Sequence, residues 1–106
     1  MKRRVVVTGI GMVTPLGLDV KTTWDAVLHG KSGVGPITAF DATEFSIKIC
    51  ARVKDFDPAP YLDPKEGRKS DMFMQYAVAA AAQAMTDSGF VTTDANARRA
   101  GVAVGA

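Results

Sequence analysis

The chain has 106 residues, of which 47% are hydrophobic and 23% are charged, and its net charge is +2. These values are typical of one soluble globular domain and exclude a disordered chain, while the absence of any apolar run of about 20 residues excludes a membrane span. So small a charge also argues against nucleic acid as a partner, because nucleic-acid-binding proteins usually carry a dense basic stripe.

The first predicted element is a strand over residues 4–8. Its sequence, RVVVT, is apolar without alternation, which is typical of a strand covered on both faces in a parallel sheet. Asp19 then stands where it would cap a helix over residues 20–29. The apolar side chains of that segment recur with the 3.6-residue period, and Gly30 follows as a stop signal.

Residues 31–45 contain several glycines and a proline and predict an irregular loop. In residues 47–53, apolar and polar side chains alternate, beginning with Ile47, Lys48, Ile49 and Cys50. This pattern predicts a strand with one polar face. Residues 55–63 are interrupted by prolines and predict a connection.

A short helical turn is predicted at Asp63, Pro64 and Glu66, which have the spacing of a cap, a first-turn proline and a capping-box acid. A long helix follows, with Ser70 as its cap, Asp71 just inside it and Gly89 as its stop. Between residues 72 and 85 it is almost wholly apolar and rich in alanine. Such a helix has no solvent face to spare, so we expect it to be buried on several sides.

The last predicted element is a second apolar strand over residues 100–104, in the sequence RAGVAVGA. The sequence stops at Ala106, where the loop after this strand would begin. We therefore expect a fragment that exposes a sheet edge and a helix meant for burial. On its own it should be poorly soluble or depend on the rest of the protein.

A glycine-rich turn after the first strand raises the possibility of a dinucleotide site. The spacing does not fit, because a fingerprint that begins Gly9 and Gly11 needs a third glycine where Thr14 stands. Pro15 also removes a backbone donor from this turn. We therefore expect no cofactor.

The candidates for catalysis are few. His29, the only histidine, is interpreted as a residue at a helix end, and Cys50 lies within a predicted strand without a helix N-terminus beside it. No cluster has the spacing of metal ligands, and a single cysteine cannot form an internal disulfide. We expect no catalytic residue in this chain, no metal site and a cytoplasmic location.

Lys65, Arg68 and Lys69 form a group of cations in the short helical turn. Their composition alone is typical of a solvated charge run. Placed at the positive end of a helix dipole, each would cost roughly 0.3 to 1 kcal/mol unless an anion offsets it.

Three blocks in order, KRRVVVTGIGMVTPLG, TTWDAVLHGKSGVGPITAFD and KEGRKSDMFMQYAVAAAAQAMTDSGF, give the chain a family resemblance. It resembles the N-terminus of the β-ketoacyl-acyl-carrier-protein synthases, the type II enzymes more than the type I or polyketide relatives. The resemblance implies an α/β fold, the N-terminal part of a thiolase-like five-layer αβαβα architecture. Residues 1–106 would be an incomplete N-terminal half of that domain.

The resemblance implies an acyltransferase of fatty-acid elongation that works as a homodimer. In that family an acyl group passes to a cysteine, and two histidines assist the decarboxylation of malonyl-acyl carrier protein before condensation. None of these three residues is expected in this chain, which should be inactive alone. A non-catalytic chain-length-factor partner is an open alternative, and a nicotinamide reductase is a third.

The resemblance also changes the interpretation of the cations. Lys65, Arg68 and Lys69 fall on the family's KE-x-RK pattern, where basic side chains meet the acidic helix of acyl carrier protein. Gly67 departs from the bulkier polar residue expected at that position, which would loosen the turn.

Overall fold

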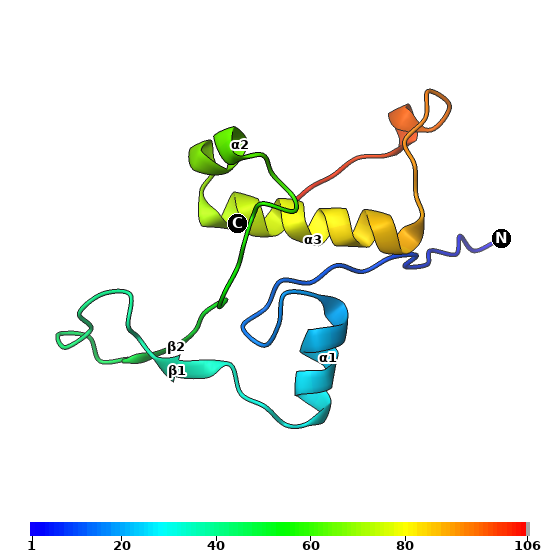
Figure 1. Cartoon of the computed structure of the whole chain (residues 1–106). Helices are drawn as coiled ribbons and strands as arrows, with labels where there is room; N and C mark the ends of the chain where they lie inside the picture. The colour runs from blue at the N-terminus through cyan, green and yellow to red at the C-terminus, as the bar shows by residue number, and fades with distance from the viewer. Residues whose placement is uncertain (106) are drawn as a thin grey trace. The chain divides into compact units, whose positions relative to one another are not determined.

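The computed structural model describes residues 1–105, and Ala106 lies outside the described residues. These residues fall into two compact units, one made of residues 1–11 and 57–105 and the other of residues 12–56. The elements, shown in Figure 1, are α1 (Val20–Leu28), β1 (Val34–Pro36), β2 (Ile49–Ala51), α2 (Pro64–Lys69), α3 (Met72–Ser88) and a 3₁₀ turn at Ala97–Arg99.

Helix α1 confirms the predicted helix and its N-cap, and it ends one residue earlier than predicted, at Leu28. The carboxylate of Asp19 accepts a hydrogen bond of 2.7 Å from the amide of Thr22, as an N-cap should. At the other end His29 is the C-cap, and Gly30 follows at φ 64°, a left-handed conformation that glycine adopts without strain. Thr23 and Ala26 are its buried residues.

Strands β1 and β2 form an antiparallel pair in which Gly35 lies opposite Cys50. The predicted loop over residues 31–45 therefore contains a strand, and the predicted strand over residues 47–53 is reduced to three residues. Ile47 and Ile49 are 69% and 59% exposed, so the apolar face expected to be covered is open within the described chain.

Helix α3 ends as predicted and begins one residue later than predicted. Gly89 closes it at φ 67°. Its N-cap is Asp71, whose side chain makes no capping bond, while the Ser70 hydroxyl donates backward to the carbonyl of Glu66 at 2.8 Å. Ser70 therefore ends α2 and does not cap α3.

The two predicted parallel-type strands are absent from the described residues. Residues 4–8 and 100–104 are irregular, and Val5 and Val102 are 87% and 84% exposed. A strand needs a neighbour to bond its backbone groups, and no described segment pairs with either of them. The 3₁₀ turn at Ala97–Arg99 was not predicted.

Burial is low throughout residues 1–105. The buried hydrophobic residues are Ala26, Ala42 and Ala79, and no large side chain is fully buried. The accessible surface is 8830 Å², whereas a compact monomer of this mass exposes about 5,700 Å². Only Gln75 and Ala79 are buried in α3, so the partners expected on several of its sides are not among the described residues, and the helix is exposed as expected for a fragment.

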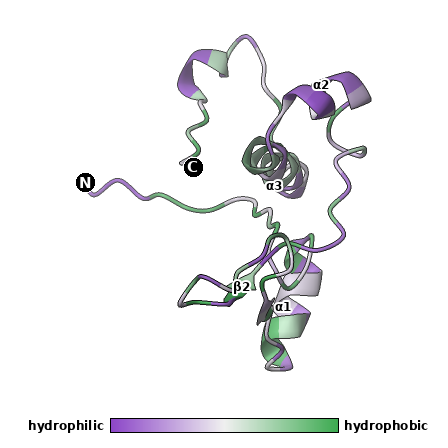
Figure 2. Cartoon of the chain, turned by 90° about the vertical axis from the view of Figure 1, so that its left-hand side faces the viewer, coloured by the Kyte–Doolittle hydropathy of each residue, from purple (hydrophilic) through white to green (hydrophobic). Residues whose placement is uncertain are grey.

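Hydropathy separates the two consecutive helices α2 and α3. Figure 2 shows α2 as largely hydrophilic, whereas α3, seen along its axis, is mixed. None of the helices within residues 1–105 combines the length and the apolar character that a bilayer crossing requires.

Candidate functional site

Helix α2 forms because its first turn is capped and a side chain in its last turn hydrogen-bonds back to its first residue. The carboxylate of Asp63 accepts the amide of Glu66 at 2.9 Å, and Pro64 occupies the first helical position, where a missing N–H costs nothing. The Arg68 side chain donates from Nε to the carbonyl of Pro64 at 3.1 Å. The predicted cap at Asp63 is confirmed.

The three predicted site residues lie together on α2. Lys65 precedes Arg68 by three residues and Lys69 by four, so the helix places them on one face. All three side chains are exposed. Within residues 1–105 the ammonium groups of Lys65 and Lys69 make no hydrogen bond or ion pair.

Two helix dipoles act on these cations with opposite sign. Arg68 and Lys69 lie in the last turn of α2, at the negative end of its dipole, where cations are favourable, and they directly precede the positive end of α3, where cations are unfavourable. Only Lys65 lies in the first turn, next to the acidic Glu66.

Acidic residues balance the cations locally. Asp57, Asp63 and Glu66 carry as much charge as Lys65, Arg68 and Lys69, so residues 57–69 are neutral overall. Two of the carboxylates serve backbone turns, since Asp57 accepts the amide of Ala59 at 3.0 Å and Asp63 caps α2. Attraction of an anionic partner to this segment therefore depends on close contact with the cations more than on long-range steering.

The end of α2 is fixed to the start of α3 by one side chain. The amide of Gln75, which is 8% exposed, donates to the carbonyl of Gly67 and to that of Ser70, each at 3.0 Å. We call this pair of hydrogen bonds the Gln75 latch. It positions the helix that carries the cations, and sequence reasoning missed it because glutamine has no spacing signal.

A hollow of about 280 Å³ lies beside the cations, between α2 and the turn over residues 58–62. The turn is closed by bonds of 2.9 Å from the amides of Tyr61 and Leu62 to the carbonyl of Pro58. The hollow is lined by Asp57, Pro58, Ala59, Leu62, Asp63, Pro64, Gly67 and Arg68. A Cβ atom at Gly67 would meet no other atom within 4 Å.

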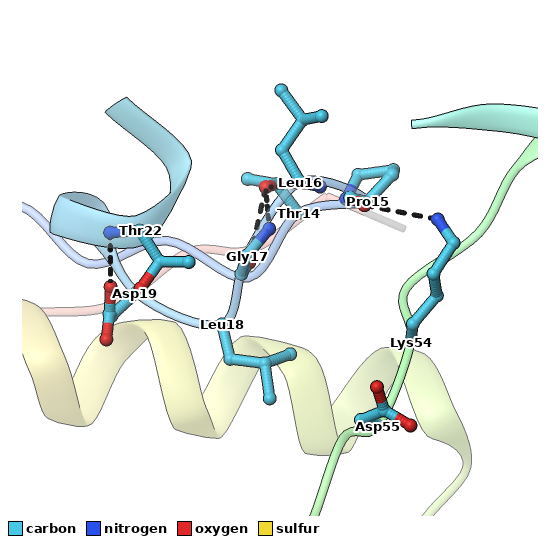
Figure 3. A pocket seen from close by; sticks show the side chains of 9 residues that line it. All are labelled: Thr14, Pro15, Leu16, Gly17, Leu18, Asp19, Thr22, Lys54 and Asp55. Atoms are coloured by element: carbon cyan, nitrogen blue, oxygen red, sulfur yellow. Dashed lines mark hydrogen bonds between the residues drawn. The ribbon is translucent and has the colours of Figure 1, made fainter. Parts of the chain in front are cut away.

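The turn over residues 14–17 uses three of its backbone amides in hydrogen bonds within the turn. The amides of Leu16 and Gly17 both donate to Oγ1 of Thr14 at 3.1 Å, and the amide of Thr14 donates to the carbonyl of Gly17 at 2.9 Å (Figure 3). Pro15 has no N–H to offer. The turn is thus closed on itself, which disfavours a pyrophosphate site there.

The Lys54 side chain hydrogen-bonds to the same turn, as Figure 3 shows. Its ammonium group donates to the carbonyls of Pro15, Gly33 and Arg52 at 3.2, 3.3 and 3.2 Å. The neighbouring Asp55 has a positive φ of 57°. Lys54 is a structural tether, and sequence reasoning did not single it out.

Gly9 and Gly11 serve close packing against α3. A Cβ atom at Gly9 would overlap the carbonyl oxygen of Ala84, and one at Gly11 would overlap that of Ala80. The amide of Ile10 between them donates to Asp87 at 3.0 Å. Backbone approach to a helix therefore explains these glycines without a cofactor.

The two candidates for nucleophilic chemistry lie apart from any catalytic arrangement. His29 is exposed at the end of α1, with Nδ1 2.7 Å from the carbonyl oxygen of Asp25. Cys50 is a half-buried free thiol in the middle of β2. Within residues 1–105 no three acidic, histidine or cysteine side chains are grouped as a metal site would need.

Comparison with known proteins shows one family over nearly the whole chain. Residues 2–106 match the family described as "Beta-ketoacyl synthase, N-terminal domain". Over 104 residues the chain is 56% identical to 3-oxoacyl-[acyl-carrier-protein] synthase 2 of Coxiella burnetii and 52% identical to that of Vibrio harveyi. These matches cover 98% of this chain and 25% of each relative, so the chain spans about a quarter of their length.

A solved structure is also similar to this chain in fold. The structure described as the ishigamide ketosynthase/chain length factor is 34% identical, with a TM-score of 0.71. The match covers 86% of this chain and 23% of that one.

Proposed function

The chain belongs to the β-ketoacyl synthase family, whose N-terminal domain it matches, and on this premise we propose that it is part of a 3-oxoacyl-[acyl-carrier-protein] synthase 2. The predicted fold class, the N-terminal part of a thiolase-like α/β fold, is confirmed by the family match and by the likeness to a ketosynthase. We further propose that residues 1–106 are an incomplete N-terminal half of that domain.

The proposed reaction is a decarboxylative Claisen condensation in fatty-acid elongation. A cysteine thiolate attacks an acyl thioester and releases the thiol of the carrier protein. Malonyl-acyl carrier protein then loses CO₂, and the resulting carbanion attacks the acyl-enzyme to give 3-oxoacyl-acyl carrier protein and the free cysteine. We assign neither Cys50 nor His29 a role in this scheme, because Cys50 lies in the middle of β2 and not at a strand-to-helix elbow, and His29 caps the end of α1.

The contribution of this chain is the docking of acyl carrier protein on α2. The observation that supports this role is the exposed face that carries Lys65, Arg68 and Lys69, held by the Gln75 latch. Cations of this kind complement an acidic helix and fix its register. The homodimer and the cytoplasmic location remain predictions.

The alternative, a non-catalytic chain-length-factor partner, is supported by the solved relative, which is described as a ketosynthase/chain length factor. Sequence beyond residue 106 separates the two: a cysteine at a strand-to-helix elbow with two later histidines means an enzyme. The relatives at 56% and 52% identity favour the synthase.

The function is tested in a hybrid protein, the Coxiella burnetii relative with this chain in place of its matching N-terminal quarter. The expected result is formation of 3-oxoacyl-acyl carrier protein, with CO₂ release, from acyl- and malonyl-acyl carrier protein. The unmodified relative is the control. A folded hybrid protein that binds no acyl carrier protein and forms no product would contradict the proposal.

A further inference from the structure

The hollow beside α2 adds a second feature to the cationic face. Its lining includes apolar residues from the 58–62 turn and from α2, namely Pro58, Ala59, Leu62 and Pro64. Arg68 is one of its lining residues, and Lys65 and Lys69 lie on the same face of α2 as Arg68. An interface commonly combines a central apolar contact with charged residues around it.

We propose that this hollow takes one apolar side chain from the acidic helix of acyl carrier protein while Lys65, Arg68 and Lys69 contact carboxylates on either side of it. This inference rests on the proposed function and specifies how the two proteins meet. The occupant is thus an apolar residue flanked by acids on a helix.

The chemistry of the lining favours an apolar group. The hollow has a volume of about 280 Å³, and most of its lining residues are apolar. The two carboxylates in its lining already accept backbone hydrogen bonds, since Asp57 accepts one from the amide of Ala59 and Asp63 accepts one from the amide of Glu66. An apolar group entering the hollow therefore faces mainly carbon.

Gly67 contributes no side chain to this space. It lines the hollow, and a Cβ atom there would meet no other atom within 4 Å. Its φ is not in the positive region, so the backbone does not require glycine at this position. Glycine inside a helix lowers helix stability. Its effect here is to leave room beside Arg68 for a group of the partner.

The test is Gly67→Leu in the hybrid protein, with Gly67→Ala as the matched control. Both substitutions raise the helix propensity of α2, but leucine adds four carbon atoms to the lining of the hollow, whereas alanine adds one. We expect Gly67→Leu to weaken the binding of acyl carrier protein about tenfold or more, as for the loss of one buried apolar side chain. The binding of acyl carrier protein by Gly67→Leu should still weaken as salt is added. Gly67→Ala should change the affinity less than threefold.

A double-mutant cycle identifies the occupant. Each apolar residue of the carrier's acidic helix is replaced by alanine, and binding is measured against Gly67 and Gly67→Leu. One alanine variant should weaken binding to the Gly67 protein and have little effect on Gly67→Leu. The inference would be overturned if the Gly67 and Gly67→Leu proteins bound acyl carrier protein equally well. It would also be overturned if Gly67→Leu changed only the oligomeric state of the hybrid protein.

Failure of the function itself is distinguishable. If reversing the three cations leaves carrier affinity unchanged, the docking role of α2 is wrong. If that reversal weakens binding but Gly67→Leu does not, only the role of the hollow is wrong.

Discussion

The side-chain amide of Gln75 lies 3.0 Å from the carbonyl oxygen of Gly67, a bond between the second turn of α3 and the last turn of α2. Gln75 is among the few buried residues of the chain, and α2 has no buried residue of its own. A helix of six residues is too short to be stable by itself, so its placement depends on such contacts.

Gln75→Leu should therefore loosen α2 in the hybrid protein. The substitution keeps most of the side-chain volume and removes two hydrogen bonds, with an expected loss of about 1 to 3 kcal/mol in the free energy of unfolding. Chemical denaturation measures that loss, and hydrogen exchange should rise at the amides of residues 67–75. Met74→Leu, at an exposed neighbouring position, is the control. Unchanged exchange at these amides would show that the latch does not position α2.

Gly11→Ala should destabilise the packing of the N-terminal segment on α3. The new Cβ atom would overlap the carbonyl oxygen of Ala80, and backbone has little freedom to move away. Overpacking of this kind costs about 1 to 3 kcal/mol. Gly35→Ala is the matched control, because its Cβ atom would meet no other atom within 4 Å. Thermal unfolding of the hybrid protein compares them, and equal melting temperatures would refute the close approach.

Helix α1 should respond to pH through its cap. The backbone amide of Thr22, then its hydroxyl, lowers the pKa of Asp19 below 3.8. A lowered pKa in the folded state means that the ionised cap stabilises α1 above about pH 4, and that this stabilisation is lost as the pH falls through the folded pKa.

Asp19→Asn keeps a capping oxygen but not the charge. The stability difference between the original hybrid protein and this variant should therefore be largest near neutral pH and shrink toward pH 3. Denaturant titrations at several pH values measure it. A difference that is independent of pH would contradict the role of the charge.

The isolated 106-residue chain should not unfold cooperatively. Its exposed side chains include Val5, Val6, Val7, Val102 and Val104, and its large accessible surface leaves little apolar burial to lose. Differential scanning calorimetry of the purified chain is the measurement. A sharp transition, with equal calorimetric and van't Hoff enthalpies, would contradict this expectation.

Local signals in the sequence predicted the helix ends well. Asp19, Asp63 and Gly89 act within one turn of their own position, so a few neighbouring residues determine their roles. Ser70 was misplaced because two cap-type residues are adjacent. The structure uses Ser70 to end α2 and Asp71 to begin α3.

Distant contacts were less predictable. The pairing of Gly35 with Cys50 and the bond from Ile10 to Asp87 join segments whose sequences carry no signal for each other. The valine-rich segment at residues 5–7 has the composition of a buried strand, but composition specifies no partner. At the candidate site, the family pattern in the sequence identifies the three cations, whereas the hollow and the Gln75 latch depend on contacts for which the sequence carries no signal.

The most direct test of the docking surface is titration of acyl carrier protein onto the hybrid protein with Lys65, Arg68 and Lys69 all replaced by glutamate. Each exposed ion pair is worth about 0.2 to 1 kcal/mol, so affinity should fall between about 3-fold and about 150-fold at low salt. High salt should reduce this difference. A control with Lys31, Arg98 and Arg99 replaced by glutamate has the same net charge, and it should bind like the unmodified hybrid protein. Equal affinity of the two triple variants at low salt would contradict the account.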